Sequence, residues 1–431
     1  MTAKKTTSLL STKFCLPPAR SNLVLRPRLL QGLDDGLGFP LTLVSAPAGF
    51  GKSTLVSQWV HTSQAVPGLV DHTVWFSIDE EDDTPVRFWE YLLAALETGN
   101  QDYLRFETAH LLLQGQPIPP AQTILTDVIN QAASLDSDLI LVLDDFQSIH
   151  DPAIVDGITF LVEHLPPRMH ILLLTRSDPS LPLGRWRIRG RLNEIRTANL
   201  RFNFEEAAAY LRQVQSLGLS DQAIQALEQR TEGWIAGLQM ARLAIQGTLS
   251  MDDRNPVSVD SFIADFTGQH HMILDYLTDE VLHRQPEEIQ SFLLKTSILS
   301  QLCPGLCAAL ADDPLTREND ASQEGKYVRL LEQLDHANLF IIPLDNHRTW
   351  YRFHHLFAEL LRVRLKEQHP EWIPKLHQQA ARWYEANGFP FEAMQHALLA
   401  EDLSLATDVI ERLVRKPATW STGNIARMLE I

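Results

Sequence analysis

The chain has 431 residues, of which 45% are hydrophobic and 21% are charged, the composition of an ordinary folded protein with room for about two to four domains. Its net charge of −17 argues against direct nucleic-acid binding by this stretch, because phosphate backbones are bound by clustered Lys and Arg. The three cysteines are not spaced as disulfide partners or metal ligands, and the sequence has no long apolar run. We therefore expect a cytoplasmic protein with no membrane partner.

We predict that residues 1–20 form an N-terminal arm. The most informative motif of the chain comes after this arm. Leu41–Thr54 reads LTLVSAPAGFGKST, which is an apolar strand, a glycine-containing loop and a helix that opens at Lys52. Gly49 and Gly51 allow backbone dihedral angles that turn successive N–H groups toward phosphate oxygens. Lys52 adds a positive charge for the β- and γ-phosphates, and Ser53 adds a hydroxyl ligand for Mg²⁺.

This loop departs from the usual G-x-x-x-x-G-K-[ST] pattern at one position, where Ala46 replaces the first glycine. Alanine is the mildest substitute there, and it leaves the remaining glycines in place. The alternative is a glycine turn beside a chance lysine, which would not explain the strand before the loop and the helix after it. The sequence therefore predicts that the chain binds ATP or ADP together with Mg²⁺.

A second diagnostic stretch, Asp138–Phe146, reads DLILVLDDF and predicts a strand buried on both faces of a parallel sheet. It ends in Asp144 and Asp145, at the end of the strand where ligands bind. In a phosphate-loop protein one carboxylate holds Mg²⁺ and a second orients the attacking water. We expect Asp144 to bind the metal with Ser53, and Asp145 to act on the water. The alternative for such a pair is a solvated turn.

A third buried strand is predicted at His170–Thr175, and it ends in Arg176. Arg176 would lie at the same edge of the sheet and stabilise a γ-phosphate there; the alternative is a surface ion pair. Leu192–Arg196 is the last predicted strand. Residues 21–200 therefore predict an α/β phosphate-loop NTPase domain, with a parallel sheet and helices on both of its faces.

From Asn203 onward the sequence changes to helical patterns. Asn203 begins a helix with a capping box and opens a helical domain expected over residues 201–290. Two helical segments followed by two short strands, Phe340–Leu344 and Thr349–Phe353, predict a winged-helix domain over residues 291–365.

Residues 366–431 predict the start of a helical arm. Trp372–Leu399 alternates small and aromatic residues, as the helix pairs of stacked repeats do. The chain ends at Ile431 inside a further helical pattern without a cap, so we expect a fragment of a longer protein.

The sequence contains 16 histidines, and two neighbouring pairs, His270-His271 and His354-His355, are the ones that suggest a metal site. Adjacent residues point in different directions on a helix, and neither pair has a carboxylate or cysteine at ligand spacing beside it. We therefore interpret His270, His271 and His355 as solvated or core-edge residues.

Several segments, taken in chain order, resemble the MalT-like signal-transduction ATPases with numerous domains, which are large ATP-binding bacterial regulators of the LuxR type. The segments are SAPAGFGKSTLVSQW, VWFSIDEEDD, LVLDDFQSI, LLLTRSDPSLPL, EGWIAGLQMARLA, FHHLFAELLR and GFPFEAMQHALLA. They span nearly the whole chain, and the resemblance implies a nucleotide-binding domain, a helical domain, a winged helix and the start of a helical arm. In that family a superhelical sensor domain and a C-terminal DNA-binding domain follow, and we expect both outside this sequence.

The resemblance also assigns roles to individual residues. Leu25 and Arg26 match a segment that packs near the adenine, and His354 matches a winged-helix histidine that reaches the ADP phosphates in related switches. The two aspartates match the family's catalytic pair, and Arg176 matches its sensor arginine. Ile235 stands where animal and plant relatives carry the proline of a glycine–proline motif. The expected nucleotide-binding residues of the loop are Ala48, Gly49, Phe50, Gly51, Lys52, Ser53 and Thr54.

The function implied by the resemblance is a nucleotide-controlled switch. ADP would hold the domains closed, ATP and an inducer would open them, and the open form would self-associate to regulate transcription, with slow ATP hydrolysis as the reset. The inducer and DNA would be bound by domains outside this chain. One alternative is a phosphate-loop ATPase or kinase acting on a small substrate, and another is the same switch with a defence or scaffold output. The helical and winged-helix regions favour a switch, because an enzyme with a small acceptor has no evident use for them.

Overall fold

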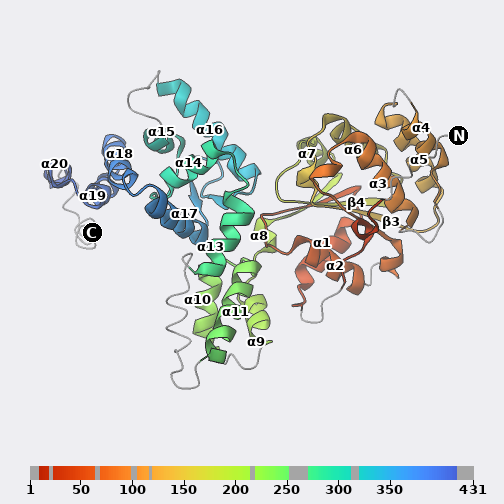
Figure 1. The fold of residues 1–431 in the computed structure, drawn as a ribbon, viewed down its shortest axis with the longest axis horizontal. Helices are drawn as coiled ribbons and strands as arrows, with labels where there is room; N and C mark the ends of the chain where they lie inside the picture. The colour runs from red at the N-terminus through yellow and green to blue at the C-terminus, as the bar shows by residue number, and fades with distance from the viewer. Residues whose placement is uncertain are drawn as a thin grey trace. The chain divides into compact units, whose positions relative to one another are not determined.

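The computed structural model describes residues 9–18, 23–63, 68–98, 104–115, 119–213, 219–251, 270–311 and 320–414. Each of the five expected regions has some residues outside this description, including 1–8 and 19–20 of the N-terminal arm and 415–431 of the helical arm. The chain forms two compact units (Figure 1), one of Met1–Glu228 with Gly233–Gln239 and one of Gln229–Glu232 with Met240–Ile431. The five-part division suggested by the sequence stays a prediction.

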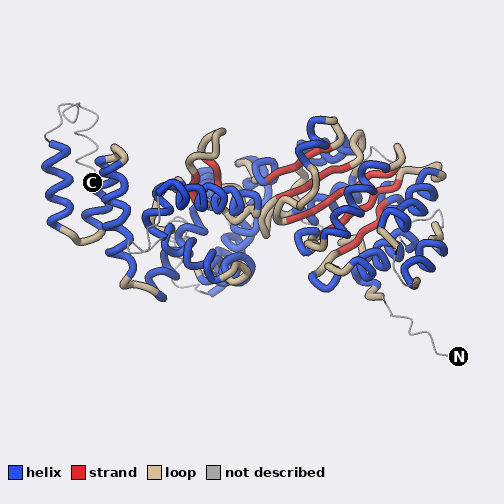
Figure 2. The backbone as a smooth tube through the Cα atoms, turned by 90° about the horizontal axis from the view of Figure 1, so that it is seen from above, coloured by secondary structure: helices blue, strands red, loops and turns tan. Residues whose placement is uncertain are grey.

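The first unit is built on a five-stranded parallel sheet (Figure 2), in the order β2-β3-β4-β1-β5. The strands are β1 (Leu41–Ser45), β2 (Thr73–Ser77), β3 (Leu139–Asp144), β4 (Met169–Thr175) and β5 (Leu192–Arg196). β1, β3 and β4 are buried along their whole length, which is why their apolar residues run continuously instead of alternating. The predicted α/β fold with a parallel sheet is confirmed.

The strand order gathers the carboxyl ends of the strands at one edge of the sheet. Ser45 at the end of β1 is in register with Thr175 of β4 and Arg196 of β5. Ser77 of β2 is in register with Asp144 of β3. Because β4 lies between β1 and β3, the residue after β4 starts between the phosphate loop and the paired aspartates.

Helices cover both faces of this sheet. The helices from Pro27 to Thr231 are α1 (Pro27–Gly36), α2 (Lys52–Thr62), α3 (Pro85–Thr98), α4 (Glu107–Gln114), α5 (Ala121–Ala133), α6 (Pro152–His164), α7 (Leu183–Ile188), α8 (Thr197–Leu200), α9 (Phe204–Arg212) and α10 (Asp221–Thr231). Figure 1 shows α1 and α2 on one face of the sheet, and α3 and α6 on the other. Asn203 caps α9 as expected, because its side chain accepts the N–H of Glu206 at 2.8 Å.

A large hydrophobic core of this unit lies between the sheet and the helices α3, α5 and α6. Trp89 of α3 is 2% exposed and packs edge-on against Phe88, with ring centroids 4.8 Å apart. Gly157 of α6 faces this indole, and a Cβ there would lie 2.4 Å from Trp89 Cζ2. Glycine at this position is therefore what lets α6 approach α3.

In its described residues the second unit is helical apart from one antiparallel hairpin, β6 (Ile341–Pro343) and β7 (Tyr351–Phe353). Its first helix, α11 (Ile235–Met251), begins in the first unit. The helices that follow are α13 (His271–Leu277) with a π-helical turn (Thr278–Leu282), α14 (Glu287–Thr296), α15 (Pro304–Ala311), α16 (Asp320–His336), α17 (His355–Gln368), α18 (Trp372–Ala386), α19 (Pro390–Leu399) and α20 (Leu403–Val414).

The sequence analysis missed one helix before the hairpin. Three helices, α14, α15 and α16, precede β6, whereas the sequence predicted two. α15 begins at Pro304 and includes Gly305. Proline is favourable in a first helical turn, because the N–H there has no intrahelical partner. A Cβ at Gly305 would lie 3.3 Å from Trp383 Nε1, so glycine accommodates the contact between α15 and α18.

The predicted helix pair of the arm is formed by α18 and α19. The imidazoles of His377 and His396 are buried between these helices, with their Nδ1 atoms 2.8 Å apart. Ala381, Ala397 and Ala406 form a small shared core that includes α20, because alanines allow helices to approach closely. Across the described parts of the chain, none of the helices combines the length and the hydropathy needed to span a bilayer.

We expect Gly157→Ala to destabilise the first unit, because the added methyl group must displace the buried indole of Trp89. Overpacking of this kind costs about 1–3 kcal/mol. Gly32→Ala in α1 is the matched control, since nothing lies within 4 Å of a Cβ at that helical glycine. The control should be neutral or stabilising by about 0.4–1 kcal/mol, through the entropy of the unfolded chain. Urea unfolding followed by circular dichroism measures both variants, and equal stabilities would contradict the close contact.

Candidate functional site

The phosphate loop joins the end of β1 to the start of α2. Gly49 and Gly51 have φ angles of 76° and 78°, in the left-handed region that glycine adopts without strain. Gly51 is the N-cap of the 11-residue α2, and the first N–H groups of a helix have no partner within it. The loop therefore has the backbone of an anion-binding nest at the positive end of a helix.

The remaining loop residues support this nest in different ways. Phe50 is 1% exposed and Ala48 is 8% exposed, so both are packed into the protein and offer a ligand only their backbone. Ser53 and Thr54 lie in the first turn of α2 and are half-buried.

Lys52 holds a buried positive charge at the centre of the loop. Lys52 is only 8% exposed, and its Nζ donates to the carbonyls of Ala46 at 2.8 Å and Pro47 at 3.2 Å. Burial, followed by the neighbouring charge of Arg176, lowers the pKa of Lys52 to about 8, while Asp145 and Asp144 act in the opposite direction. The charges of Arg176, Asp144 and Asp145 are thus all close enough to act on Lys52. An incoming phosphate would favour the charged form of the lysine.

Ser53 and Asp144 are brought together at the position expected for a metal ion. The Ser53 hydroxyl donates to Asp144 Oδ1 at 3.0 Å, and the N–H of Asp145 donates to the same oxygen at 3.0 Å. Burial and then the charge of Asp145 raise the pKa of Asp144 to about 6, which indicates a carboxylate short of positive partners. A hydroxyl and a carboxylate suit Mg²⁺, which takes one or two protein oxygens and completes its shell with phosphate and water.

Asp145 is oriented by a residue that the sequence analysis missed. Asp145 has a left-handed backbone, with φ of 58°, and its Oδ1 accepts Gln147 Nε2 at 2.9 Å. Gln147 Oε1 in turn accepts the backbone N–H of Arg176 at 2.9 Å. Gln147 therefore links the second aspartate to the residue after β4. Its position just after the aspartate pair was the available signal.

A second polar link ties β1 to its neighbours at the same edge of the sheet. The hydroxyl of Ser45, the last residue of β1, donates to Asp178 Oδ1 at 3.1 Å. Asp178 also pairs with Arg196 at the end of β5, and Arg196 pairs with Glu194. The sequence analysis did not single out Asp178 or Arg196, although charged residues at the ends of adjacent parallel strands are a usable signal.

Leu25 and Arg26, which we expected near the adenine, have different environments. Leu25 is 60% exposed and lines a cavity of about 250 Å³ with Arg28 and Glu206. Arg26 is 5% exposed, and its Nη2 donates to the carbonyls of Leu200 and Arg201, both at 2.9 Å, and pairs with Glu206 at 3.0 Å. The Arg26 guanidinium thus joins the start of α1 to the start of α9, which leaves Leu25 as the residue available to a ligand.

The segment Gly233–Gln239 lies behind the phosphate loop, a contact that the sequence analysis did not identify. Trp234 is fully buried, and its Nε1 donates to the carbonyl of Ala48 at 3.1 Å. The N–H of Ala236 donates to the carbonyl of Gly49, also at 3.1 Å. Both carbonyls of the nest are therefore held from one side, which leaves the N–H groups on the other side for an anion.

His354 is at the N-cap of α17 and is 2% exposed. Its Nε2 lies 2.9 Å from the carbonyl of Thr231, and its ring packs edge-on against Phe340 with centroids 5.5 Å apart. The neighbouring His355 side chain is 63% exposed, as expected for a solvated histidine. The predicted contact of His354 with ADP stays a prediction.

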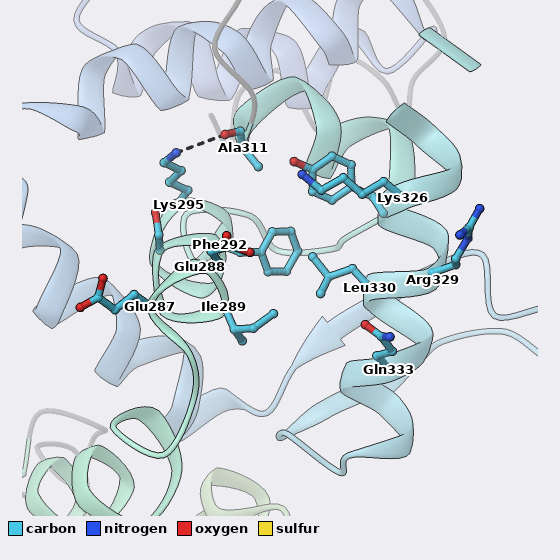
Figure 3. Close-up of a pocket in the computed structure, with 12 residues that line it drawn as sticks. Glu287, Glu288, Ile289, Phe292, Lys295, Ala311, Lys326, Arg329, Leu330 and Gln333 are labelled. Carbon is cyan, nitrogen blue, oxygen red and sulfur yellow. Dashed lines mark hydrogen bonds between the residues drawn. The ribbon is translucent and has the colours of Figure 1, made fainter. Parts of the chain in front are cut away.

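The second unit contains a separate cavity of about 880 Å³ between α14 and α16 (Figure 3). Its floor includes Phe292 and Tyr327, whose rings are stacked with centroids 5.8 Å apart. Its charges have both signs, with Glu287 and Glu288 on one wall. Lys295 on α14 donates to the carbonyl of Ala311 at 3.1 Å. Because the charges are mixed, this cavity does not match the chemistry of a phosphate site.

One segment of the chain matches a known protein family. Residues 278–373 match the family described as the MalT winged helix domain. The chain is 31% identical over 402 residues to the HTH-type transcriptional regulator MalT of Yersinia pestis (strain Pestoides F), covering 93% of this chain and 42% of that protein. MalT of Yersinia enterocolitica gives the same identity and coverage. The chain therefore spans less than half the length of the curated relatives that it matches.

Solved structures are similar at lower identity. A signal-transduction ATPase with numerous domains and a tetratricopeptide repeat sensor, from Pyrococcus horikoshii, is 15% identical with a TM-score of 0.39, covering 93% of this chain and 52% of that one. The Orc1 protein of Aeropyrum pernix is 14% identical with a TM-score of 0.42, covering 83% of this chain and 95% of that one. The chain is thus similar to the MalT regulators over most of its own length, and its residues 278–373 match the MalT winged helix domain.

Proposed function

We propose that this chain is the nucleotide-controlled switch of a MalT-like transcriptional regulator, and that it binds ATP or ADP with Mg²⁺. The observation that carries the proposal is the phosphate loop, where Lys52 is buried among carbonyls and the Ser53 hydroxyl lies 3.0 Å from Asp144. This combination of a nest, a buried cation and a hydroxyl–carboxylate pair is what binding of a magnesium nucleotide requires.

Each residue of the loop region has a proposed role. The backbone N–H groups of residues 48–54 bind the phosphates, Lys52 neutralises their charge, and Ser53 and Asp144 hold Mg²⁺. When bound, the metal would neutralise charge that develops on the phosphates during hydrolysis. Asp145, held by Gln147, orients the attacking water, and Arg176 stabilises charge at the γ-phosphate. The adenine would lie beside Leu25, with Arg26 fixing that segment. The activity would be slow ATP hydrolysis to ADP and phosphate.

The switch itself is proposed from the MalT-like sequence and the winged helix. ADP would favour a closed resting state through contacts that include His354, and ATP with an inducer would favour an open state that self-associates. The inducer and DNA would be bound by parts of the protein beyond this chain, which spans 42% of the MalT regulator that it matches. A cytoplasmic location follows from that role.

Lys52→Ala should abolish binding of both ADP and ATP, because it removes the only full charge that the loop itself supplies. Loss of a charge-assisted contact costs about 1.5–3 kcal/mol, which is on the order of 10–150-fold in affinity. Lys375→Ala on α18 is the control, since that lysine is exposed. Isothermal calorimetry measures both variants, and unchanged affinity of Lys52→Ala for both nucleotides would refute the site.

Asp144→Asn and Asp145→Asn should have different effects. The first should weaken the dependence of ATP binding on Mg²⁺, because a ligand oxygen is lost. The second should keep MgATP bound while hydrolysis falls, because only the water loses its orienting group. Nucleotide affinity with and without Mg²⁺, together with phosphate release, separates the two effects. An equal loss of Mg²⁺ dependence in both variants would contradict the assignment.

His354→Ala should release ADP faster, on the order of 5–150-fold, because a contact made only in the closed state biases the equilibrium by its differential free energy. His355→Ala, at the exposed neighbouring position, should change little. Displacement of a fluorescent ADP analogue gives the release rates, and small-angle scattering reports opening. If neither variant releases ADP faster, the imidazole of His354 contributes only to packing in the core.

A further inference from the structure

The turn between α10 and α11 contains two consecutive left-handed residues, Glu232 with φ of 49° and Gly233 with φ of 68°. Glycine is required at the second position, because a Cβ there would lie 2.3 Å from the carbonyl oxygen of Phe202. At the first position Glu232 adopts a left-handed conformation, which is unfavourable for any residue that has a Cβ. Interactions of the glutamate side chain must therefore offset the strain.

Three contacts from the start of α17 and the strand before it hold the residues that precede Gly233. The Arg352 guanidinium pairs with the Glu232 carboxylate through two parallel bonds, Nη1 to Oε1 at 2.7 Å and Nη2 to Oε2 at 2.9 Å. The N–H of His355, in the first turn of α17, donates to Oε1 at 3.0 Å. His354 Nε2 lies 2.9 Å from the carbonyl of Thr231.

The hydrogen bonds between Arg352 and Glu232 are charge-assisted and therefore strong. The Glu232 side chain is 6% exposed, and a bidentate arginine–carboxylate pair fixes direction as well as distance. Burial raises the pKa of this carboxyl, but the Arg352 bonds, the nearby His354 and the His355 N–H outweigh burial and lower the pKa to about 2. Glu232 also serves as the cap of α17, because the N-cap residue His354 makes no side-chain capping bond.

The residues that follow directly contact the phosphate loop instead. Trp234 Nε1 donates to the Ala48 carbonyl, and the Ala236 N–H donates to the Gly49 carbonyl, both at 3.1 Å. Only Gly233 separates Glu232 from Trp234, and a chain this short has almost no slack, since each residue extends at most about 3.6 Å. The polypeptide thus changes from winged-helix contacts to phosphate-loop contacts within a single left-handed turn.

We propose that Glu232 and Arg352 are positioning residues that couple the phosphate loop to α17 through the Thr231–Ala236 turn. The inference rests on the nucleotide binding proposed above and adds a route that needs no contact between a histidine and the nucleotide. Phosphate binding fixes the loop N–H groups in place, and with them the carbonyls of Ala48 and Gly49 on the other side of the nest. The two bonds from Trp234 and Ala236 extend this restraint to the turn, and the Glu232 carboxylate extends it to the N-terminus of α17.

Arg348 provides a matched control on the same β-hairpin. It pairs with Asp335 of α16 at 3.3 Å, its side chain is 46% exposed, and it has no contact with the turn among the described interactions. Arg348→Met therefore removes a guanidinium from the hairpin without touching Glu232. Arg352→Lys keeps the charge and loses the bidentate geometry, so it tests the pair in a variant that is close to the wild-type fold.

Hydrogen exchange with mass spectrometry on the full 431-residue chain, with and without saturating ADP, tests the coupling. In the wild-type chain ADP should slow exchange in three segments, residues 46–54, 233–239 and 351–358. In Arg352→Met the slowing should persist in the first two segments, while the ADP effect at 351–358 falls by on the order of tenfold. Arg352→Lys should show an intermediate loss, and Arg348→Met should behave as the wild type.

The outcomes separate this inference from the proposed function. If ADP leaves residues 46–54 unchanged in the wild-type chain, nucleotide binding itself fails, and the coupling falls with it. If ADP protects 46–54 and the protection at 351–358 survives in both Arg352 variants, the coupling is overturned while nucleotide binding stands. Should Arg352→Met unfold, as circular dichroism would reveal, the comparison of Arg352→Lys with Arg348→Met gives the result.

Discussion

The buried ammonium group of Lys52 is the feature on which the candidate site depends. Burial disfavours its charged form, and the guanidinium of Arg176 adds repulsion, so its pKa falls to about 8 even with two carbonyls and two aspartates nearby. A phosphate would supply the negative charge that this arrangement lacks. Burial and the charge of Asp145 likewise raise the pKa of Asp144, and a divalent cation would favour its charged form.

The nest around this lysine is held in shape before any ligand arrives. Its carbonyls at Ala48 and Gly49 accept bonds from the segment that begins α11, and the strand before it is fixed by the bond between Ser45 and Asp178. Donors that are already oriented need no reorganisation when an anion binds, and this strengthens recognition. The site therefore draws on distant parts of the sequence for its rigidity.

The division of the chain into units explains how a local event at the loop could have a wider effect. One boundary lies inside the turn Thr231–Ala236, since Gln229–Glu232 belongs to the second unit and Gly233–Gln239 to the first. Each side of this boundary is anchored by hydrogen bonds within its own unit, at Thr231 and Glu232 on one side and at Trp234 and Ala236 on the other. The proposed coupling therefore needs only contacts within each unit and the peptide bond that joins Glu232 to Gly233.

The sequence by itself determined the parallel sheet, the phosphate loop, the capping of α9 and the helix pair of the arm, because continuous apolar runs, glycine placement and capping residues are local signals. It did not predict α15, since Pro304 and Gly305 also mark the ends of helices. Only the tertiary structure placed Gln147 against Asp145, Trp234 against the loop, and Arg352 against Glu232. Contacts between residues 120 or more positions apart, as in the last two pairs, leave no periodicity in the sequence, because packing of whole elements and not local preference brings them together.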